Sequence, residues 1–591
     1  MGYRAPQADI RFALDHVGQL GDLLGLASFD HLDTGLSGEM ITEAARFVEN
    51  VIAPTNRAGD TAGVRFDGRD VRVPEAFGAA YRQFSGAGWG AVGYPAEFGG
   101  AGAPLTLNIA IREMVVSGNL AFSMCPFLAG GVAAVLLRYG NDDQRERYLP
   151  ALASGEWSGT MDITEPQAGS DVGACTTHAE RTADGGYLIR GQKIFISYGD
   201  HDLTEQILHL VLARLPDGPP GSKGLSLFLV PKLLLNPDGS LGPRNDVTVL
   251  GVEHKLGLHG APTCVLAYGE QGRGAVGELV GQEHQGIQAM FTMMNDARLG
   301  VGLQGLALAE LACQRAVTHA RERIQGVPAG TPAGARAAII EHPDVRRMIM
   351  TMTASIAAMR AVVYATARAI DLAEQSGDAD ARAAWRLRAD LLTPTCKAWC
   401  TDLGVELIST AMQVFGGMSF IEETGIAQVY RDARITPIYE GTNGIQAIDL
   451  AARKLLGDNG GAARDYLRSA SATATELGRQ DPDLGTALAA GVRVLDQATT
   501  LMLSRDQQRR ALLATATPYQ RLFGTVLGAS SLAAGVVHAH AAGAGPETLA
   551  KPIALLRFYL NTVLPQVHGL LPQVAIGDEG LYSLTAGQLT A

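Results

Sequence analysis

Cysteine is scarce in this chain, which has only six in 591 residues. No two of them form a Cys-x-x-Cys pair, and Cys396 and Cys400 have neither a second pair nor a nearby histidine. Disulfide-stapled folds and zinc sites need denser, regularly spaced ligands. The sequence therefore predicts free thiols in a reducing, cytoplasmic setting and no metal site.

The chain also lacks an excess of basic residues. It has 48 Lys and Arg and 60 Asp and Glu, which gives a net charge of −12. Nucleic-acid binders need a basic face to replace counterions, so no nucleic-acid partner is expected. The charged start, with Arg4 and Asp9, excludes a signal-peptide core. Phe127–Leu137 is too short to cross a bilayer. Phe523–Gly545 favours a closely packed helix, with membrane association as the minor alternative.

The pattern of apolar residues divides the chain into five parts and predicts a mainly α protein with a central antiparallel β domain. Helical spacing dominates on both sides of a stretch where short β-rich runs alternate with Gly, Pro and Asp turns. Pro394 is expected to kink or interrupt its helix. The expected parts are an N-terminal extension (1–37), a helical domain (38–155), a β domain (156–286), a helical bundle (287–457) and a C-terminal helical domain (458–591).

Two segments of the β domain carry groups suited to a polar ring system. Met161–Asp171 combines hydroxyls, a proline turn and a glycine, and Gly191–Gly199 places Phe195 and Ser197 on a strand. Free hydroxyls and backbone N–H groups there can bond a ligand's polar edge. Taken alone, the first segment is more often a surface turn and the second a core strand.

Two helix ends carry groups suited to a phosphate or a close backbone approach. Arg321–Gly326 ends a long helical run with arginines that match phosphate geometry. Gln413–Phe420 contains the pair Gly416-Gly417. Taken alone, these are more often a solvated helix end and a helix C-cap.

The segment Arg431–Gln446 places Glu440 between Tyr439 and Gly441, just before a helix. Burial would raise the pKa of this carboxyl and make it a usable base near neutral pH. Thr442 is a natural N-cap for the helix. The alternative is a glutamate that only serves the helix N-terminus.

In this order, the five segments resemble the acyl-CoA dehydrogenase family. The family's Thr-Glu-Pro-x-Ala-Gly-Ser-Asp stretch matches Thr164–Asp171, its Gly-x-Lys strand matches Gly191–Ser197, and its Ile-Tyr-Glu-Gly-Thr motif matches Ile438–Gln446. The likeness covers roughly residues 38–456. The added terminal parts resemble a larger branch that includes bacterial 3-methylmercaptopropionyl-CoA dehydrogenases and broad-range or long-chain acyl-CoA dehydrogenases.

The resemblance implies an FAD between the β domain and the bundle, and an acyl-CoA substrate. The residues that it assigns to the cofactor are Ile163, Thr164, Phe195, Ser197, Arg323, Gln413, Gly416, Gly417, Thr442 and Gln446. Those that it assigns to the substrate are Ser170, Arg298, Tyr439 and Gly441. An insert at Gly326–Gly334 alters the spacing after Arg323.

The implied reaction is α,β-dehydrogenation of an acyl-CoA to a 2-enoyl-CoA, in which Glu440 removes the α-proton and flavin N5 accepts the β-hydride. Some relatives take their base from a glutamate just before the bundle arginine, but here Ala297 holds that position. Where the family has a tryptophan and an asparagine on the flavin strand, this chain has Phe195 and Tyr198.

The family implies an electron-transfer flavoprotein as electron acceptor and a homodimer. For the acyl group, the resemblance to the larger branch implies 3-methylmercaptopropionyl or a medium or long fatty acyl chain. An acyl-CoA oxidase is the alternative. A nucleic-acid-binding member of the fold is less favoured, because ten Lys and Arg balance ten Asp and Glu from Asp458 onward. A scaffold without flavin is a third reading.

Overall fold

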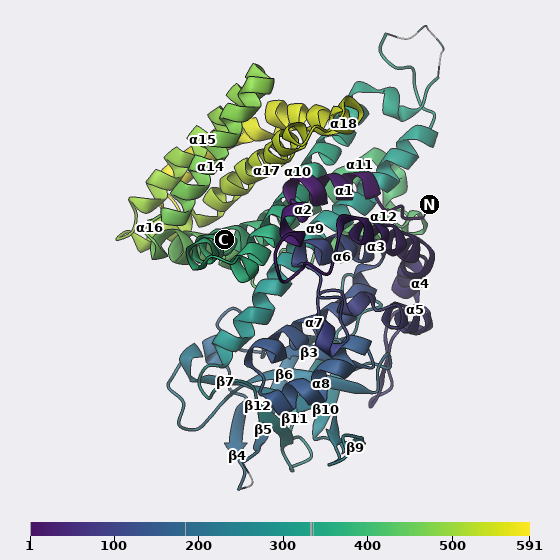
Figure 1. Cartoon of the computed structure of the whole chain (residues 1–591), viewed down its shortest axis with the longest axis vertical. Coiled ribbons are helices and arrows are strands. Elements are labelled where there is room, and N and C mark those ends of the chain that lie inside the picture. The colour runs from purple at the N-terminus through teal and green to yellow at the C-terminus, as the bar shows by residue number, and fades with distance from the viewer. Residues whose placement is uncertain (1, 184, 331, 333, 335, 591) are drawn as a thin grey trace.

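The computed structural model describes residues 2–183, 185–330, 332, 334 and 336–590. Figure 1 shows a β domain below a bundle of long helices, with the helices that follow residue 460 packed against the bundle at the upper left. The fold class expected from the sequence is confirmed. The insert at 326–334 includes residues 331 and 333, which lie outside the described residues.

Helices of the N-terminal half precede the β domain. They are α1 (Gln7–Phe12), α2 (Leu20–Leu24), α3 (Thr34–Phe47), α4 (Ala53–Ala62), α5 (Glu75–Gly86), α6 (Leu105–Gly118), α7 (Leu120–Tyr139) and α8 (Asp142–Ser154), with a small hairpin of β1 (Arg65–Phe66) and β2 (Val71–Arg72). Asn141 caps α8 through a capping box with Gln144. Nearly every residue of α6 is buried, so this helix is core on all sides.

The β domain contains β3 (Trp157–Asp162), β4 (His178–Arg181), β5 (Tyr187–Ser197), β6 (Gln206–Arg214), β7 (Leu225–Pro231), β8 (Leu233–Leu235), β9 (Leu241–Arg244), β10 (Val247–Val252), β11 (Thr263–Tyr268) and β12 (Ala275–Leu279). Pairings of β5 with β12, β12 with β7, β7 with β6, β6 with β4 and β4 with β5 close a ring of strands.

Most strand pairs are antiparallel, as expected, but β6 pairs in parallel with β3 along its length and with β4 at one position. The chain between them crosses the domain through β4 and β5, which is the long connection that a parallel pair requires. The β7 strand is buried along its whole length and β6 along all but its last residue. This burial explains their continuous apolar runs.

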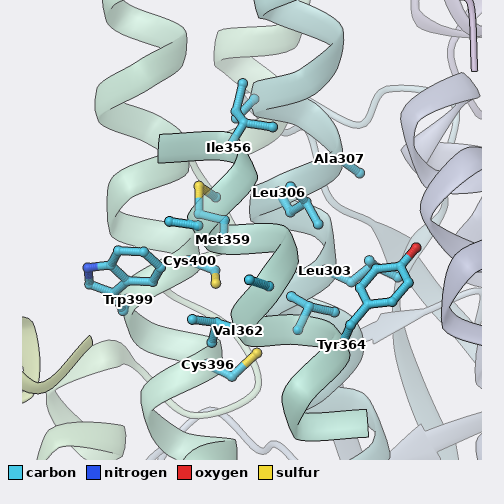
Figure 2. Close-up of a cluster of buried hydrophobic side chains, with 14 of the residues drawn as sticks. Leu303, Leu306, Ala307, Ile356, Met359, Val362, Tyr364, Cys396, Trp399 and Cys400 are labelled. Carbon is cyan, nitrogen blue, oxygen red and sulfur yellow. The ribbon is translucent and has the colours of Figure 1, made fainter. Parts of the chain in front are cut away.

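Three long helices form the bundle: α9 (Gly286–Glu322), α10 (Pro343–Gln375) and α11 (Ala379–Phe415). Figure 2 shows their shared core, with Leu303, Leu306 and Ala307 on α9 meeting side chains of the other two helices. Of the kink or interruption expected at Pro394, the interruption does not occur, because α11 continues through this residue. Proline removes one backbone hydrogen bond, and the burial of residues 391–401 against neighbouring helices holds the rest of the helix.

The chain then runs through α12 (Ile426–Ala433) and α13 (Asn443–Ile448) into α14 (Gly461–Gln480), α15 (Pro482–Leu503), α16 (Arg509–Ala514), α17 (Ala516–Ala541), α18 (Pro546–Phe558) and α19 (Val567–Ala575). Gly524 of α17 allows Trp399 of α11 to approach, since a Cβ there would lie 2.3 Å from the indole Cγ. The C-terminal helices are thus seated directly on the bundle.

The N-terminal segment packs against these last helices. Asp9 forms an ion pair with Lys551 of α18 at 2.6 Å. The Nδ1 atom of His16 lies 3.4 Å from the Nδ1 atom of His538 on α17. Ile10 is fully buried. The two ends of the described chain therefore share one hydrophobic core.

Among the described residues, three helices are long and apolar enough to cross a membrane by length and composition: α7, α10 and α17. Within this fold, 67%, 72% and 83% of their most apolar windows are buried. Their apolar residues therefore build the protein core in this structure.

Candidate active site

The turn that carries Glu440 lies between α12 and α13. Glu440 adopts a left-handed backbone with φ 56°, and Gly441 follows at φ 75°. A left-handed conformation costs a non-glycine residue of the order of 1–3 kcal/mol, so the surrounding contacts must hold it. Thr442 caps α13, as expected, since its Oγ1 accepts a hydrogen bond from the Ile445 amide at 3.3 Å.

Burial raises the pKa of Glu440 to about 7, while the cations Arg298 and Lys397 oppose this rise and the negative charge of Asp296 adds to it. No described side chain or backbone N–H group donates a hydrogen bond to the Glu440 carboxylate. The hydrogen bonds that Lys397 and Gln446 donate to this turn are accepted by the backbone carbonyls of Glu440 and Gly441. The carboxylate is therefore free to take a proton from a bound molecule near neutral pH.

Lys397 of α11 supports this turn from behind. Its Nζ donates to the Gly441 carbonyl at 2.9 Å and to Asn443 Oδ1 at 2.8 Å. Asn443 in turn donates to Asp402 Oδ1 at 2.7 Å and to Thr401 Oγ1 at 2.9 Å. Burial lowers the pKa of Lys397 to about 7, while Glu440 and Asp402 raise it. Lys397 thus positions the Glu440 turn and supplies a nearby positive charge.

Sequence reasoning missed Lys397 and Asn443. The available signal was a lysine inside the run 391–401, whose other members are apolar or small hydroxyl residues. A buried lysine needs a partner, and such a residue at a helix facing a catalytic turn points to that turn.

Arg298 lies on α9, buried close to Glu440. Its Nη1 donates to Asp449 Oδ2 at 3.3 Å, and its buried Nε has no hydrogen-bond partner among the described residues. Asp449 also pairs with Arg453 at 2.7 Å. Arg298 therefore retains a donor for a ligand group beside Glu440.

Tyr439 and Gln446 fix the two ends of the turn. Tyr439 donates a short hydrogen bond to Gln304 of α9. Gln446 Nε2 donates to the carbonyls of Glu440 at 3.1 Å and Gly441 at 3.3 Å, and its buried Oε1 has no partner in the described part of the chain. The structure therefore brings together six predicted residues: Arg298, Tyr439, Glu440, Gly441, Thr442 and Gln446.

The strand β5 carries the second group of predicted residues. Phe195 sits in a bulge of β5 at φ 60°, and its side chain is 59% exposed on the β domain. The Thr164 carbonyl accepts the Ile194 amide at 2.9 Å, and the Ile163 carbonyl accepts Lys193 Nζ at 3.0 Å. Ile163, Thr164 and Phe195 are thus neighbours on one surface.

Buried Lys193 and Glu165 hold that surface in place. They form an ion pair at 2.9 Å, and Glu165 also accepts the amides of Thr176 at 2.8 Å and Thr177 at 3.0 Å. These bonds fasten the loop that follows β3 to β5.

Ser197 and Ser170 differ in their setting. Ser197 pairs with Thr263 of β11, at the end of β5, and the next residue, Tyr198, donates to the Ala121 carbonyl of α7 at 2.7 Å. Ser170 is exposed. No contact in the described residues joins Ser170 to the Glu440 turn.

The third group lies where α9 and α11 end. His319 stacks on Phe415 with ring centroids 4.4 Å apart, which brings these two helix ends together. Arg323 there is exposed and makes no ion pair with any described residue, and Gln413 is exposed. Gly416 at φ 61° and Gly417 have open space where a Cβ would stand. This end suits a phosphate and a close backbone approach.

A cavity of about 400 Å³ lies between α9 and the start of the C-terminal helices, and Arg298 is one of its lining residues. Phe291 and Asn295 of α9 also line it, together with Arg453 and Lys454 of the segment after α13. The guanidinium groups of Arg298 and Arg453 lie 5.8 Å and 5.9 Å from the Phe291 ring centroid. The lining carries no net charge, because its three cations are balanced by Asp390, Asp449 and Asp458.

Comparison with known families covers most of the chain. The N-terminal, middle and C-terminal domain models of acyl-CoA dehydrogenases match residues 38–156, 160–269 and 284–455, and an acetyl-CoA dehydrogenase C-terminal-like model matches 463–585. The chain belongs to the acyl-CoA dehydrogenase family. It is therefore an enzyme of acyl-CoA dehydrogenation.

Two curated relatives illustrate the branch. The 3-methylmercaptopropionyl-CoA dehydrogenase of Ruegeria pomeroyi is 42% identical, over 95% of this chain and 96% of the relative. A broad-specificity linear acyl-CoA dehydrogenase, FadE5 of Mycobacterium tuberculosis, is 38% identical, over 78% of this chain and 76% of the relative. The expected resemblance to this larger branch is confirmed.

Two solved structures share the fold. ACDH-11 of Caenorhabditis elegans in complex with C11-CoA has a TM-score of 0.75 at 19% identity, covering 92% of this chain and 89% of that one. An acyl-CoA dehydrogenase of Bacillus anthracis complexed with FAD has a TM-score of 0.70 at 18% identity, covering 93% and 90%.

The cofactor of this family is FAD, and the described residues fit it. The exposed Phe195 offers a ring face, Gln446 a buried acceptor without a partner, and Arg323 a cation near two accessible glycines. These are the groups that a flavin ring, its polar edge and a pyrophosphate would use.

Proposed function

We propose that Glu440 is the base that removes the α-proton of the acyl-CoA thioester. The observation that carries this role is a carboxylate with a pKa of about 7, held in a strained turn and free of hydrogen bonds from the chain. Near pH 7 a large fraction of the carboxylate is ionised, yet it is basic enough to accept a proton.

The reaction removes a proton from Cα and a hydride from Cβ of the substrate and leaves a 2-enoyl-CoA. Bound FAD supplies the acceptor for the hydride. The Glu440 carboxylate holds the proton at the end of the step. The chain's task is to place the Cα–H bond against Glu440 and to stabilise the charge that develops on the thioester oxygen.

The backbone amide of Glu440 is suited to that stabilisation. It donates to no acceptor in the described residues, whereas the neighbouring Tyr439 amide donates to the Ile435 carbonyl at 3.1 Å. A backbone N–H aimed at a developing oxyanion is a common and effective donor in acyl chemistry. We assign the Glu440 N–H to the thioester carbonyl.

The cavity lined by Arg298 and Phe291 is the proposed path for the CoA part of the substrate. Phe291 offers an apolar wall there, and Arg298 retains a buried Nε donor without a partner in the described residues. Asp390, Asp449 and Asp458 balance the cations of the lining. Ser170 would then meet the CoA part only where it passes the β domain.

The identity of the acyl group is proposed from the names of similar proteins. Among the relatives, one is named for 3-methylmercaptopropionyl-CoA and another for broad specificity on linear acyl-CoAs. We take 3-methylmercaptopropionyl-CoA as the first substrate to test and medium or long fatty acyl-CoAs as the second. An electron-transfer flavoprotein is the proposed electron acceptor.

A homodimer is proposed as the assembled form. Large apolar side chains are exposed around the cofactor surfaces, including Leu256 (63%), Met418 (52%) and Phe420 (89%). Clustered apolar groups of this kind mark an interface. A second copy would cover them and bring its own residues toward Arg323 and Gly416.

The test compares the Glu440→Gln variant with the wild type, each loaded with FAD and mixed with acyl-CoA in a stopped-flow instrument. Loss of a general base costs roughly 10² to 10⁴ in rate, so the flavin of the variant should bleach at least about a hundredfold more slowly. Glu423→Gln, at an exposed glutamate before α12, is the control and should bleach normally.

Normal bleaching by Glu440→Gln would refute the role of Glu440. Rapid formation of hydrogen peroxide on turnover of the wild type would instead favour an oxidase.

A further inference from the structure

A second cavity, of about 350 Å³, lies between the N-terminal segment and the bundle. Its lining residues come from positions 2–17, from 310–321 of α9, from 353–361 of α10, and from α17 and α18. On α9, Glu310 lies roughly 18 Å along the helix from Arg298, since an α-helix rises about 1.5 Å per residue. This cavity is therefore separate from the Glu440 turn and from the cavity that Arg298 lines.

Most of the lining of this second cavity is apolar. Phe12 and Val17 come from the N-terminal segment, Leu311 from α9, Ile356 from α10 and Leu555 from α18. Protein interiors leave few voids larger than a water molecule, and apolar voids hold water poorly. A space of this size, which is within the range of small-molecule sites, therefore suits the apolar part of a bound molecule.

The carboxylates of the lining already have partners within the chain. Asp9 forms an ion pair with Lys551 at 2.6 Å, and Glu310 forms one with Arg360 at 2.9 Å. Arg360 also pairs with Glu113, which lies outside the lining, at 2.8 Å. No carboxylate of the described lining is thus left to bind a cationic ligand.

Arg321 is the cation of the lining that remains available. Arg4 pairs with Glu49 at 2.7 Å, and Arg315 donates to the Gly425 carbonyl at 2.7 Å. The Arg321 guanidinium is exposed and makes no ion pair or hydrogen bond with any described residue. Because a guanidinium matches the planar geometry of a carboxylate, the cavity combines an apolar interior with an anion-binding group at its mouth.

Arg321 also points away from the predicted FAD phosphate site. His319 stacks on Phe415 at the end of α11, and Arg323, four positions after His319, lies on the same side of the chain. Residues two apart on an α-helix point in directions that differ by roughly 200°. Arg321 is therefore on the opposite side of α9 from the groups assigned to the cofactor.

We propose that this cavity is a second binding site, separate from the site of dehydrogenation, for a medium-length aliphatic monocarboxylate such as a fatty acid. The alkyl chain lies between the N-terminal segment and the bundle, and the carboxylate meets Arg321 at the mouth. A single available cation suits a single negative charge, and the mainly aliphatic walls suit an alkyl chain. The bound molecule would also fasten the N-terminal segment to α9 and α10, since it contacts all three.

The experiment titrates the FAD-loaded enzyme with sodium octanoate, 1-octanol and sodium butanoate in a calorimeter, while the flavin spectrum is recorded. We expect octanoate to bind roughly twofold to fivefold more tightly than octanol, as for an ion pair at a surface. Butanoate should bind at least roughly tenfold more weakly than octanoate, because it buries four fewer methylenes. The flavin spectrum should not change, and octanoate should raise Tm in a concentration-dependent way.

Arg321→Gln is the deciding variant, because it removes the cation and leaves the apolar walls. The ratio of octanoate to octanol affinity should fall to about one, with octanol binding retained. Arg346→Gln is the matched control, since Arg346 is an exposed arginine of α10 that lies outside the lining and makes no ion pair with a described residue. It should leave the ratio unchanged.

Ala357→Phe places a ring in the cavity from α10 and should abolish binding of both octanoate and octanol. Should this variant not fold, Val317→Phe of α9 takes its place. Three results would overturn the proposal: no binding of octanoate to the wild type, an unchanged ratio in Arg321→Gln, or a flavin spectrum that shifts as octanoate binds. The last result would place octanoate in the acyl-CoA site.

Discussion

Two buried polar clusters each include a residue of α9 and differ in how completely their atoms are hydrogen-bonded. Around Arg360, the Nε donates to Glu113 Oε1 at 2.8 Å, Nη2 to Glu310 Oε2 at 2.9 Å, and Tyr364 to Glu113 Oε2 at 2.9 Å. Around Glu440, by contrast, Arg298 Nε and Gln446 Oε1 have no partner among the described residues.

The difference separates structure from function. The cluster around Arg360, whose named polar atoms are hydrogen-bonded, holds α6, α9 and α10 together. The cluster around Glu440 retains buried polar atoms that can still form hydrogen bonds with a bound molecule. Completeness of hydrogen bonding is therefore a better guide to the site here than buried charge itself.

The largest effect should come from breaking the satisfied cluster. Arg360→Met leaves Glu113 and Glu310 buried without their cation, which typically costs about 3–5 kcal/mol of unfolding free energy. Urea unfolding measures this loss. The flavin of the molecules that still fold should be reduced at the normal rate, and a variant as stable as the wild type would remove the contrast between the clusters.

The same substitution at Arg298 should act on activity more than on stability. Asp449 keeps Arg453 as an ion-pair partner, so Arg298→Met leaves no isolated charge. The variant loses a donor and a positive charge beside the substrate, a loss of about 1.5–3 kcal/mol in transition-state binding. Measured kcat/KM should drop roughly tenfold to a hundredfold, with a smaller change in urea midpoint than Arg360→Met shows.

Lys397 should change the pH dependence. Burial raises the pKa of Glu440 to about 7, so kcat/KM of the wild type should rise with pH through that value as the carboxylate ionises. Lys397 opposes the rise, and Lys397→Met should therefore move the activity curve to higher pH, each pH unit corresponding to about 1.4 kcal/mol.

Lys397→Arg, which keeps the charge, should restore the position of the curve in part. A loss of rate at every pH without any shift would mean that Lys397 acts only by holding the turn.

The smallest effect is expected at the N-cap of α13. Thr442→Ala removes the hydrogen bond to the Ile445 amide and should cost about 1 kcal/mol of unfolding free energy. Thr442→Ser retains the bond and is the control. If the alanine variant also lost FAD at low concentration, Thr442 would belong to the cofactor site as well.

The sequence predicted the order of helices and strands and the Glu440 turn, because hydrophobic period and ordered motifs are local signals. It did not predict the parallel β3–β6 pair, which depends on how the chain crosses the domain. The helix is not interrupted at Pro394, because tertiary packing outweighs one lost hydrogen bond.

The partner of Lys397 was beyond the sequence for a different reason. A lysine in an apolar run indicates that Lys397 needs a partner, but Asn443 beside the Glu440 turn meets α11 only in the folded chain. No local spacing records that meeting.

The ion pair between Asp9 and Lys551 joins positions separated by 542 residues. A ribosome adding about 5–20 residues per second needs roughly half a minute to two minutes to cover that interval. During this time Ile10 and its apolar neighbours have emerged but the helices that bury them have not been made. The apolar N-terminal segment of this enzyme is therefore not buried until translation ends. Until then, chaperones or transient contacts must cover it.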